Sequence, residues 1–359
     1  MQNKIKMFLL LMLGVSLNAQ YISVDKYISI HPNEEIIMNK FVSLVNHKAE
    51  PLSKENKKIK IAMLYPSLQL SDYWRRNKIA FEKRLIESNI DYTIDMIETS
   101  SSINPIKQER FISKIIKSKY DFLITTLNSN LEKNLIKNVL VSTNTKVILQ
   151  NITTPIKNWK LQPLAYVGFD HKIGSLKIAD YFLKKFKVGN YAVMFHTQGY
   201  VSQMRGDTFI DYMNNNSNLK LYDSYYTQGN EEKARVATLD LLENTKDLKF
   251  IYASSTDIAI GVSKALQSLG LKDTILVNGW GGGSKELEML NTKELDVTVM
   301  RINDDAGIVM SEIIKGIILK DKTPKIFSGE MVLIDNDTSK EDIEVLIKKS
   351  FRYSDEYNR

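Results

Sequence analysis

The chain has 359 residues, 43% hydrophobic and 25% charged, which is enough for about two globular domains with sizeable cores. Its formal net charge of +7 comes from lysines scattered along the sequence. This scatter argues against nucleic-acid binding, which requires clustered basic residues with interleaved aromatic residues. The sequence contains no cysteine, which excludes a disulfide framework, a zinc–cysteine site and a cysteine nucleophile.

Residues 1–19 have the pattern of a cleavable signal peptide. Lys4 and Lys6 form a short basic region, residues 7–15 are an apolar run, and Ala19 suits the position before the cleavage site. The run is too short to span a bilayer, and no later segment approaches the roughly 18 apolar residues that a spanning helix needs. We therefore expect a protein secreted to the periplasm, with no direct membrane insertion.

After a polar, weakly helical N-terminal arm at 20–56, short apolar runs alternate with amphipathic segments. This alternation predicts an α/β fold with doubly wound parallel sheets. The first strands are expected at 59–64, 92–97, 122–126 and 146–149, separated by helices at 72–87, 108–117 and 131–140. The alternation restarts with strands at 166–168, 191–195, 221–225, 250–253, 275–278, 297–300 and 330–334, and helices at 174–185, 205–214, 231–243, 256–269, 284–290 and 304–319.

Two successive α/β units of similar size predict two lobes joined by a hinge. We assign 57–156 plus 302–326 to the N-terminal lobe and 157–301 plus 327–345 to the C-terminal lobe. Ligands of open α/β sheets bind at the carboxyl ends of the strands. Two such lobes face to face would enclose a ligand in a cleft that closes on binding.

The sequence carries no recognisable enzyme motif. HExxH, GxSxG and GxxxxGK are absent, and the four histidines lack metal-ligand spacing to one another. His171, in a predicted strand-to-helix turn, is interpreted as a capping or interdomain polar contact. The glycines at 281–283 could cradle a phosphate, but they lack dinucleotide-site spacing and favour a tight turn that approaches a ligand or a neighbour. We expect neither catalysis nor a metal site.

Polar and aromatic residues recur just after the predicted strands, where they would line a cleft between two lobes. This recurrence is the strongest indication of a binding site that the sequence itself contains. The residues at these positions are Gln69, Ser71, Trp74, Asn151, Arg205, Thr256, Asp257, Trp280 and Arg301. Ser71, Thr256 and Asp257 could instead cap helices, and the two tryptophans could be ordinary core residues.

The two arginines of this set have acidic neighbours in the sequence. Arg205 lies close to Asp207, and Arg301 lies close to Asp304 and Asp305. Taken singly, an ordinary salt bridge is the interpretation that we favour for either arginine.

The strings around these residues resemble the LuxP family of periplasmic proteins that bind autoinducer-2, within the ribose-binding-like, type I periplasmic binding proteins. The resemblance runs from about residue 60 nearly to the C-terminus. Its strings are SDYW at 71–74, QNITTP at 150–155, VGFDH at 167–171, RGDTF at 205–209, STD at 255–257, NGWGGG at 278–283, VMR at 299–301 and FRYSD at 351–355.

The resemblance implies a quorum-sensing receptor that binds autoinducer-2 as a furanosyl borate diester, with the nine residues named above as its ligand contacts. Boron would arrive as part of the ligand, and no cofactor is expected. A LuxQ-like membrane sensor histidine kinase is implied as the partner. The alternative is a substrate-binding subunit of an ABC importer for a pentose or borate-free autoinducer-2. A sugar-responsive repressor core is disfavoured by the signal peptide and by the lack of a DNA-binding headpiece before residue 60.

Overall fold

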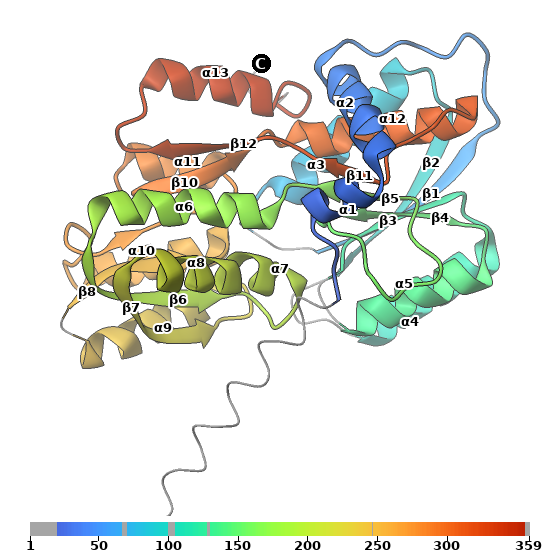
Figure 1. Cartoon of the computed structure of the whole chain (residues 1–359). Helices are drawn as coiled ribbons and strands as arrows, with labels where there is room; N and C mark the ends of the chain where they lie inside the picture. Colours follow the sequence, from blue (N-terminus) through green and yellow to red (C-terminus); the bar gives the residue numbers. More distant parts are fainter. Residues whose placement is uncertain (1–19, 67–69, 100–104, 128–129, 246, 356–359) are drawn as a thin grey trace, which may run out of the picture.

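The computed structural model of the protein describes residues 20–66, 70–99, 105–127, 130–245 and 247–355, and the signal peptide expected at 1–19 lies outside them. The chain forms two α/β lobes that lie side by side (Figure 1). This arrangement confirms the predicted fold class. No helix in the described ranges combines the length and the apolar character that crossing a membrane requires.

The first lobe is built on a six-stranded parallel sheet with the order β11-β5-β4-β3-β1-β2. Its strands are β1 (Ile59–Pro66), β2 (Tyr92–Thr99), β3 (Phe122–Thr125), β4 (Lys146–Gln150), β5 (Ala165–Gly168) and β11 (Ile326–Ser328). Its helices are α3 (Tyr73–Glu87), α4 (Pro105–Ser118), α5 (Asn130–Ser142) and α12 (Asp304–Leu319), with α4 and α5 on one side of the sheet in Figure 1.

Strand β1 is apolar from Ile61 onward, with Lys60 exposed near its start, because helices cover both faces of its sheet. Ile61, Met63 and Tyr65 belong to a core cluster that includes residues of α3 and α12. Ala62 and Leu64, which point to the opposite face, belong to a second cluster with residues of α4 and α5. The apolar run from Ile61 to Tyr65 therefore corresponds to a strand buried on both sides.

The second lobe contains a four-stranded parallel sheet with the order β7-β6-β8-β9, and β10 pairs antiparallel with β12. Isolated parallel bridges join β10 to the segment after β9. The strands are β6 (Val188–Phe195), β7 (Asn218–Tyr226), β8 (Leu248–Ala253), β9 (Leu276–Val277), β10 (Val297–Arg301) and β12 (Met331–Asp335). The helices are α6 (His171–Lys185), α7 (Tyr200–Ser202), the π-helix η1 (Gln203–Asp207), α8 (Thr208–Asn216), α9 (Glu231–Asn244), α10 (Thr256–Ser268), α11 (Ser284–Asn291) and α13 (Lys340–Ser350).

The position of β5 differs from our expectation that residues 157–301 lie in the second lobe. Ala165 pairs with Ile148 of β4, and Tyr166 pairs with Ile326 of β11, so β5 belongs to the first sheet. No helix separates β4 from β5, and the local pattern therefore resembled the start of a new unit. Strand partners are chosen by non-local pairing, which a local pattern does not report. The exact lobe bounds stay predictions.

The chain crosses between the lobes after β5, after β10 and after β11. Backbone hydrogen bonds tie neighbouring crossings together. The Gly329 amide donates to the Gly168 carbonyl at 2.8 Å, and the Ile302 amide donates to the Glu330 carbonyl at 3.0 Å. These crossings bring the carboxyl ends of β4 and β10, from different lobes, to the same cleft.

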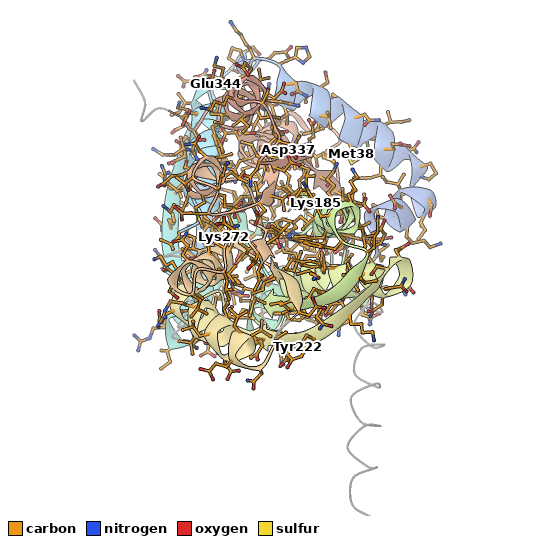
Figure 2. The ribbon with its side chains drawn as sticks, turned by 90° about the vertical axis from the view of Figure 1, so that its left-hand side faces the viewer. Met38, Lys185, Tyr222, Lys272, Asp337 and Glu344 are labelled. Carbon is orange, nitrogen blue, oxygen red and sulfur yellow. The ribbon has the colours of Figure 1, made fainter. Side chains whose placement is uncertain are left out.

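The arm expected at 20–56 contains two helices, α1 (Val24–Ile30) and α2 (Pro32–Asn46), and packs on the first lobe. Phe41 is buried in the core, and the Glu34 carboxylate accepts the amides of Lys325 and Ile326. Figure 2 shows α2, labelled at Met38, along the outside of the molecule, far from Tyr222 on β7. The arm is therefore an integral part of the first lobe's surface.

Candidate functional site

The predicted site residues that the structure describes all line one small cavity between the lobes. Gln69 lies outside the described residues. The cavity has a volume of about 60 Å³. The first lobe contributes residues from the start of α3 and the end of β4, and the second lobe contributes the rest. The predicted residues that line the cavity are Ser71, Trp74, Asn151, Arg205, Thr256, Asp257, Trp280 and Arg301.

Arg301, the last residue of β10, is buried but unpaired. Its side chain is 5% exposed, and its guanidinium carbon lies 4.0 Å from the centre of the Tyr73 ring. Among the described residues, none forms a hydrogen bond with its side chain, and its Nε is fully buried. Gly281 makes room for it, because a Cβ at Gly281 would lie 2.4 Å from Nη2 of Arg301. The side chain is thus held by stacking while its donors remain available.

Arg205 lies in the π-helix η1 and is held more tightly. Its Nε donates to Nδ1 of His171 at 3.3 Å, and its Nη1 donates to the Ser254 carbonyl at 2.7 Å. Its guanidinium carbon lies 3.6 Å from the centre of the Trp280 ring. A π-helical turn re-aims a side chain relative to a regular helix, and Gly206 allows the turn to pack against Phe195.

No carboxylate in the described part of the chain lies within 4.0 Å of either guanidinium. The salt-bridge interpretation is wrong for Arg301, since Asp305 pairs with Arg352 at 2.6 Å and Asp304 accepts the amides of Tyr353 and Ser354. Burial, together with the positive charge of the other arginine, lowers the pKa of the Arg205 guanidinium to about 9, which leaves it protonated at neutral pH. Burial also lowers the pKa of Arg301.

Asp257 and Thr256 belong to the first turn of α10, but neither is its N-cap, which is Ser255. Asp257 instead reaches the other lobe, where its Oδ1 accepts the amide of Leu70 at 3.0 Å. Burial raises the pKa of the Asp257 carboxyl. The α3 N-cap is Asp72 rather than Ser71. Asp257 therefore makes a contact across the cleft that helix capping does not explain. The Ser71 hydroxyl still accepts the amide of Tyr73, the first residue of α3, at 3.5 Å, so a local contact at the helix start and a place at the cavity coexist for this residue.

The glycines at 281–283 shape the wall of the cavity and do not form a phosphate cradle. The amide of Gly282 is already bound by Oε2 of Glu286 at 2.8 Å, and Oε1 of Glu286 accepts the amide of Trp280 at 2.8 Å. The Trp280 indole donates to the Tyr252 hydroxyl at 2.9 Å, so hydrogen bonds hold both the backbone and the ring of this residue. Trp280 is thus both a buried residue and the surface on which Arg205 stacks.

Asn151 follows β4 in a left-handed backbone conformation, with φ of 64°. Its carbonyl accepts Nε2 of His171 at 3.0 Å, which confirms the interdomain polar contact expected for His171. Its side-chain Oδ1 is buried without a hydrogen-bond partner among the described residues. A buried acceptor of this kind is usually satisfied, and its position at the cavity suits a ligand hydroxyl.

Sequence reasoning missed several residues that form the site. Tyr73 supplies the ring beneath Arg301, Ser254 supplies the carbonyl that holds Arg205, and buried Glu286 organises the glycine turn. Tyr73 precedes Trp74 and Ser254 lies two residues before Thr256, so their proximity to predicted residues was visible in the sequence. Glu286 gave no such signal, because its role depends on the turn that precedes α11.

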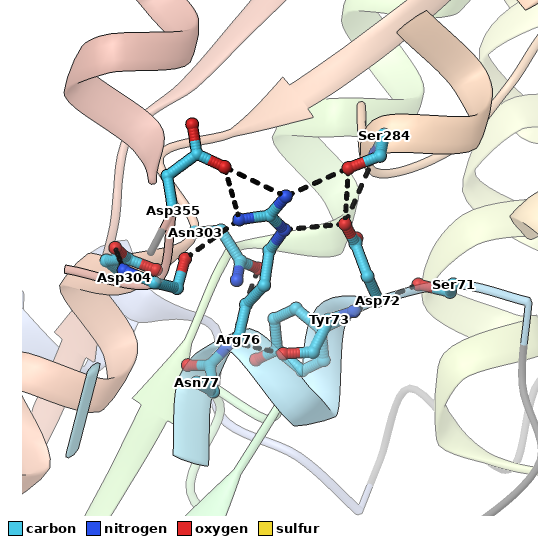
Figure 3. Close-up of polar contacts among 10 residues, drawn as sticks. Ser71, Asp72, Tyr73, Arg76, Asn77, Ser284, Asn303, Asp304 and Asp355 are labelled. Atoms are coloured by element: carbon cyan, nitrogen blue, oxygen red, sulfur yellow. Dashed lines mark hydrogen bonds and ion pairs between the residues drawn. The ribbon is translucent and has the colours of Figure 1, made fainter. Parts of the chain in front are cut away.

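A second polar cluster, the Arg76 cluster, joins the lobes beside the cavity (Figure 3). Arg76 of α3 donates to Asp72 at 2.5 Å, to Ser284 of α11 at 2.9 Å, to Ser354 at 3.1 Å and to Asp355 at 3.4 Å. The Ser284 hydroxyl also donates to Asp72 at 2.9 Å. Although burial alone would raise the pKa of the Asp72 carboxyl, Arg76 and Ser284 hold it below its usual value. The cluster therefore fixes the spacing of the two walls of the cleft.

Comparison with known proteins agrees with this architecture. A family model described as a periplasmic binding protein domain matches residues 61–322. A solute-binding protein of an ABC transporter from Agrobacterium vitis, solved with bound D-fucose, is similar with a TM-score of 0.72 and 20% identity, covering 79% of this chain and 98% of that chain.

Two further similar structures are a domain of a hybrid two-component system and a complex of two proteins. The fructose-binding periplasmic domain of a hybrid two-component system is similar with a TM-score of 0.70 and 17% identity, covering 81% of this chain and 97% of that chain. The XylFII–LytSN complex gives a TM-score of 0.67 and 18% identity, covering 79% of this chain and 100% of that chain. At these identities the likeness concerns the fold.

Proposed function

Because this chain belongs to the periplasmic binding protein domain family, we propose that it is a periplasmic receptor for autoinducer-2, bound as the furanosyl borate diester. The observation that carries the proposal is Arg301, which is buried at the cavity without any hydrogen-bond partner among the described residues. A buried charge without a partner is costly. An anionic ligand would compensate it, and Arg205 would add a second positive charge.

The chemistry of the ligand suits the residues around the cavity. A tetracoordinate borate ester is an anion that presents many oxygen atoms. The guanidinium groups of Arg205 and Arg301 would donate charge-assisted hydrogen bonds to it. Asn151, with its unsatisfied Oδ1, and Asp257 would accept hydrogen bonds from the ring hydroxyls. The Trp280 ring excludes water from this contact, which strengthens the ionic interactions.

A membrane sensor histidine kinase of the LuxQ type is the partner that we propose. Support comes from two similar structures: one is a periplasmic domain of a hybrid two-component system, and the other is the XylFII–LytSN complex. A second candidate function, delivery of a pentose or of borate-free autoinducer-2 to an ABC importer, is favoured by the similarity to ABC transporter solute-binding proteins with bound sugars. In either function the protein binds a ligand and has no catalytic role.

The deciding experiment is a calorimetric titration of the mature protein with the autoinducer-2 precursor, with and without added borate. The proposal expects binding that requires borate and that is lost in Arg301→Ala. Arg235→Ala is the control, because this exposed arginine pairs with Glu232 on α9 and does not line the cavity. Borate-independent binding that tolerates Arg301→Ala, or binding of pentoses alone, would overturn the receptor proposal in favour of the importer.

A further inference from the structure

His171 is completely buried behind the cavity, between the two lobes. It is the first residue of α6, and its two ring nitrogens contact groups of opposite character. Nε2 faces the Asn151 carbonyl at 3.0 Å, and Nδ1 faces Nε of Arg205 at 3.3 Å. A carbonyl only accepts and an arginine Nε only donates. The ring must therefore be neutral, with its proton on Nε2 and a free lone pair on Nδ1.

The other groups around the ring agree with a neutral imidazole. Arg205 and Arg301 are the charged residues that act on it, and the rings of Trp280 and Tyr200 lie 5.4 Å and 5.9 Å from its centre. Burial, reinforced by the positive charge of Arg205, holds the pKa of His171 well below its usual value. A second proton would place an N–H of the ring against the N–H of Arg205.

The contact with His171 completes the restraint of Arg205. The guanidinium is fixed at Nε by His171, at Nη1 by the Ser254 carbonyl and on one face by Trp280. No described residue forms a hydrogen bond with its Nη2. The N–H groups of Nη2 therefore have no partner among the described residues, and they belong to a side chain that lines the cavity. The three restrained positions set the direction in which these groups point.

We propose that His171 is a positioning residue that holds Arg205 in the orientation needed to bind an anionic ligand, and that it ties this orientation to the opposite lobe through Asn151. The inference rests on the proposed function for the identity of the ligand. His171 itself does not touch the ligand, since it does not line the cavity. Its contribution is to accept one hydrogen bond without adding charge, which lysine, arginine or a protonated histidine would not do.

Two substitutions separate the two hydrogen bonds of the ring. In His171→Asn, the amide oxygen takes the place of Nδ1 and still accepts from Arg205, while the donor to Asn151 is lost. In His171→Gln, the amide nitrogen reaches the place of Nε2 and still donates to Asn151, while the acceptor for Arg205 is lost. Both side chains are neutral and polar, so each variant serves as the matched control for the other.

The expected result is a rescue pattern in the affinity for the borated ligand. His171→Gln leaves a buried arginine N–H without an acceptor and weakens binding by about 10-fold or more. His171→Asn keeps the affinity within about 3-fold of the wild type, a loss of binding free energy smaller than that of one hydrogen bond. Equal losses in both variants, or wild-type affinity in His171→Gln, would overturn the positioning role.

A measurement without ligand separates this inference from the proposed function. Nitrogen NMR of ¹⁵N-histidine-labelled protein at neutral pH, with the His171 signals assigned by their loss in His171→Asn, reports which ring nitrogen carries the proton. The inference expects a proton on Nε2 and none on Nδ1; a proton on Nδ1 would overturn it. If the wild type binds no borated ligand, the proposed function fails, and the tautomer alone decides whether His171 accepts from Arg205.

Discussion

Two buried arginines beside the same cleft have opposite environments. Arg76 is 6% exposed and contacts the carboxylates of Asp72 and Asp355, together with the hydroxyls of two serines. Arg301 is 5% exposed and has no hydrogen-bond partner among the described residues. A buried charge is tolerated when it is paired and is costly when it is not. The difference identifies Arg76 as a structural contact between the lobes, and it supports our proposal that Arg301 binds an anionic ligand.

The largest expected effect is on ligand binding by Arg301→Met. This substitution removes the unpaired charge and keeps much of the apolar volume over the Tyr73 ring. We expect affinity for the borated ligand to fall by about 100-fold or more, since a lost ionic contact in a buried site costs roughly 2–5 kcal/mol. The thermal unfolding temperature of the unliganded protein should stay constant or rise, because a desolvated charge is gone. Calorimetric titration and scanning calorimetry measure both quantities.

The same substitution at Arg76 should have the opposite effect on stability. Arg76→Met leaves the buried carboxylate of Asp72 without its cation, and we expect the unfolding free energy to fall by about 2–3 kcal/mol. The lost pair with Asp355 adds little to this value, because Asp355 is partly exposed and solvent screens the interaction. Urea denaturation of Arg76→Met and Arg301→Met in parallel measures the difference. Equal stability losses in the two variants would show that both arginines are structural, which would contradict the contrast between Arg76 and Arg301.

A smaller effect is expected from Gly281→Ala. Gly281 has a φ of 133°, which an alanine rarely adopts, and the added Cβ would lie 2.4 Å from Nη2 of Arg301. We expect a stability loss of about 1–3 kcal/mol from backbone strain and a loss of ligand affinity from displacement of Arg301. Gly270→Ala is the control, since its φ is also positive, at 66°, but nothing lies near its Cβ. Similar affinities in the two variants would contradict the steric argument.

The smallest effect should follow from Ser284→Ala in the Arg76 cluster. This change removes the hydroxyl that donates to Asp72 and accepts from Arg76, while the backbone amide of residue 284 still donates to Asp72 at 3.3 Å. Because Arg76 and Asp72 still pair with each other, the unfolding free energy should fall by only about 1 kcal/mol. A loss as large as that of Arg76→Met would mean that the serine, rather than the ion pair, joins the lobes.

Much of the fold could be predicted from the sequence because its signals are local. The apolar run of β1 and the alternation after it were sufficient to predict two α/β lobes, and the polar residues after the strands do converge on one cavity. The assignment of β5 was wrong because no helix separates it from β4, and because its other partner, Ile326 of β11, is distant in the sequence. The α/β pattern also gave no indication of helix α13 or of the π-helical turn that carries Arg205.

The site was harder to predict where a residue's role depends on a distant partner. The sequence placed Arg301 near Asp304 and Asp305, but only the fold shows that Asp305 pairs with Arg352. The contact between Arg76 and Asp355 joins residues that are 279 positions apart. No spacing rule reports such a pair. Predicted identities of the ligand contacts stay predictions, while their convergence is a property of the fold.

The pairing of β5 with β11 also has a consequence for how the molecule is made. β5 ends at residue 168, but its outer neighbour β11 begins at residue 326. During synthesis the β5 edge of the first sheet therefore stays unpaired until almost the whole chain has emerged, and unpaired strand edges promote aggregation. A chain that stops short of residue 326 would leave the β5 edge permanently unpaired. Only a nearly complete polypeptide can supply the last strand of its own first sheet.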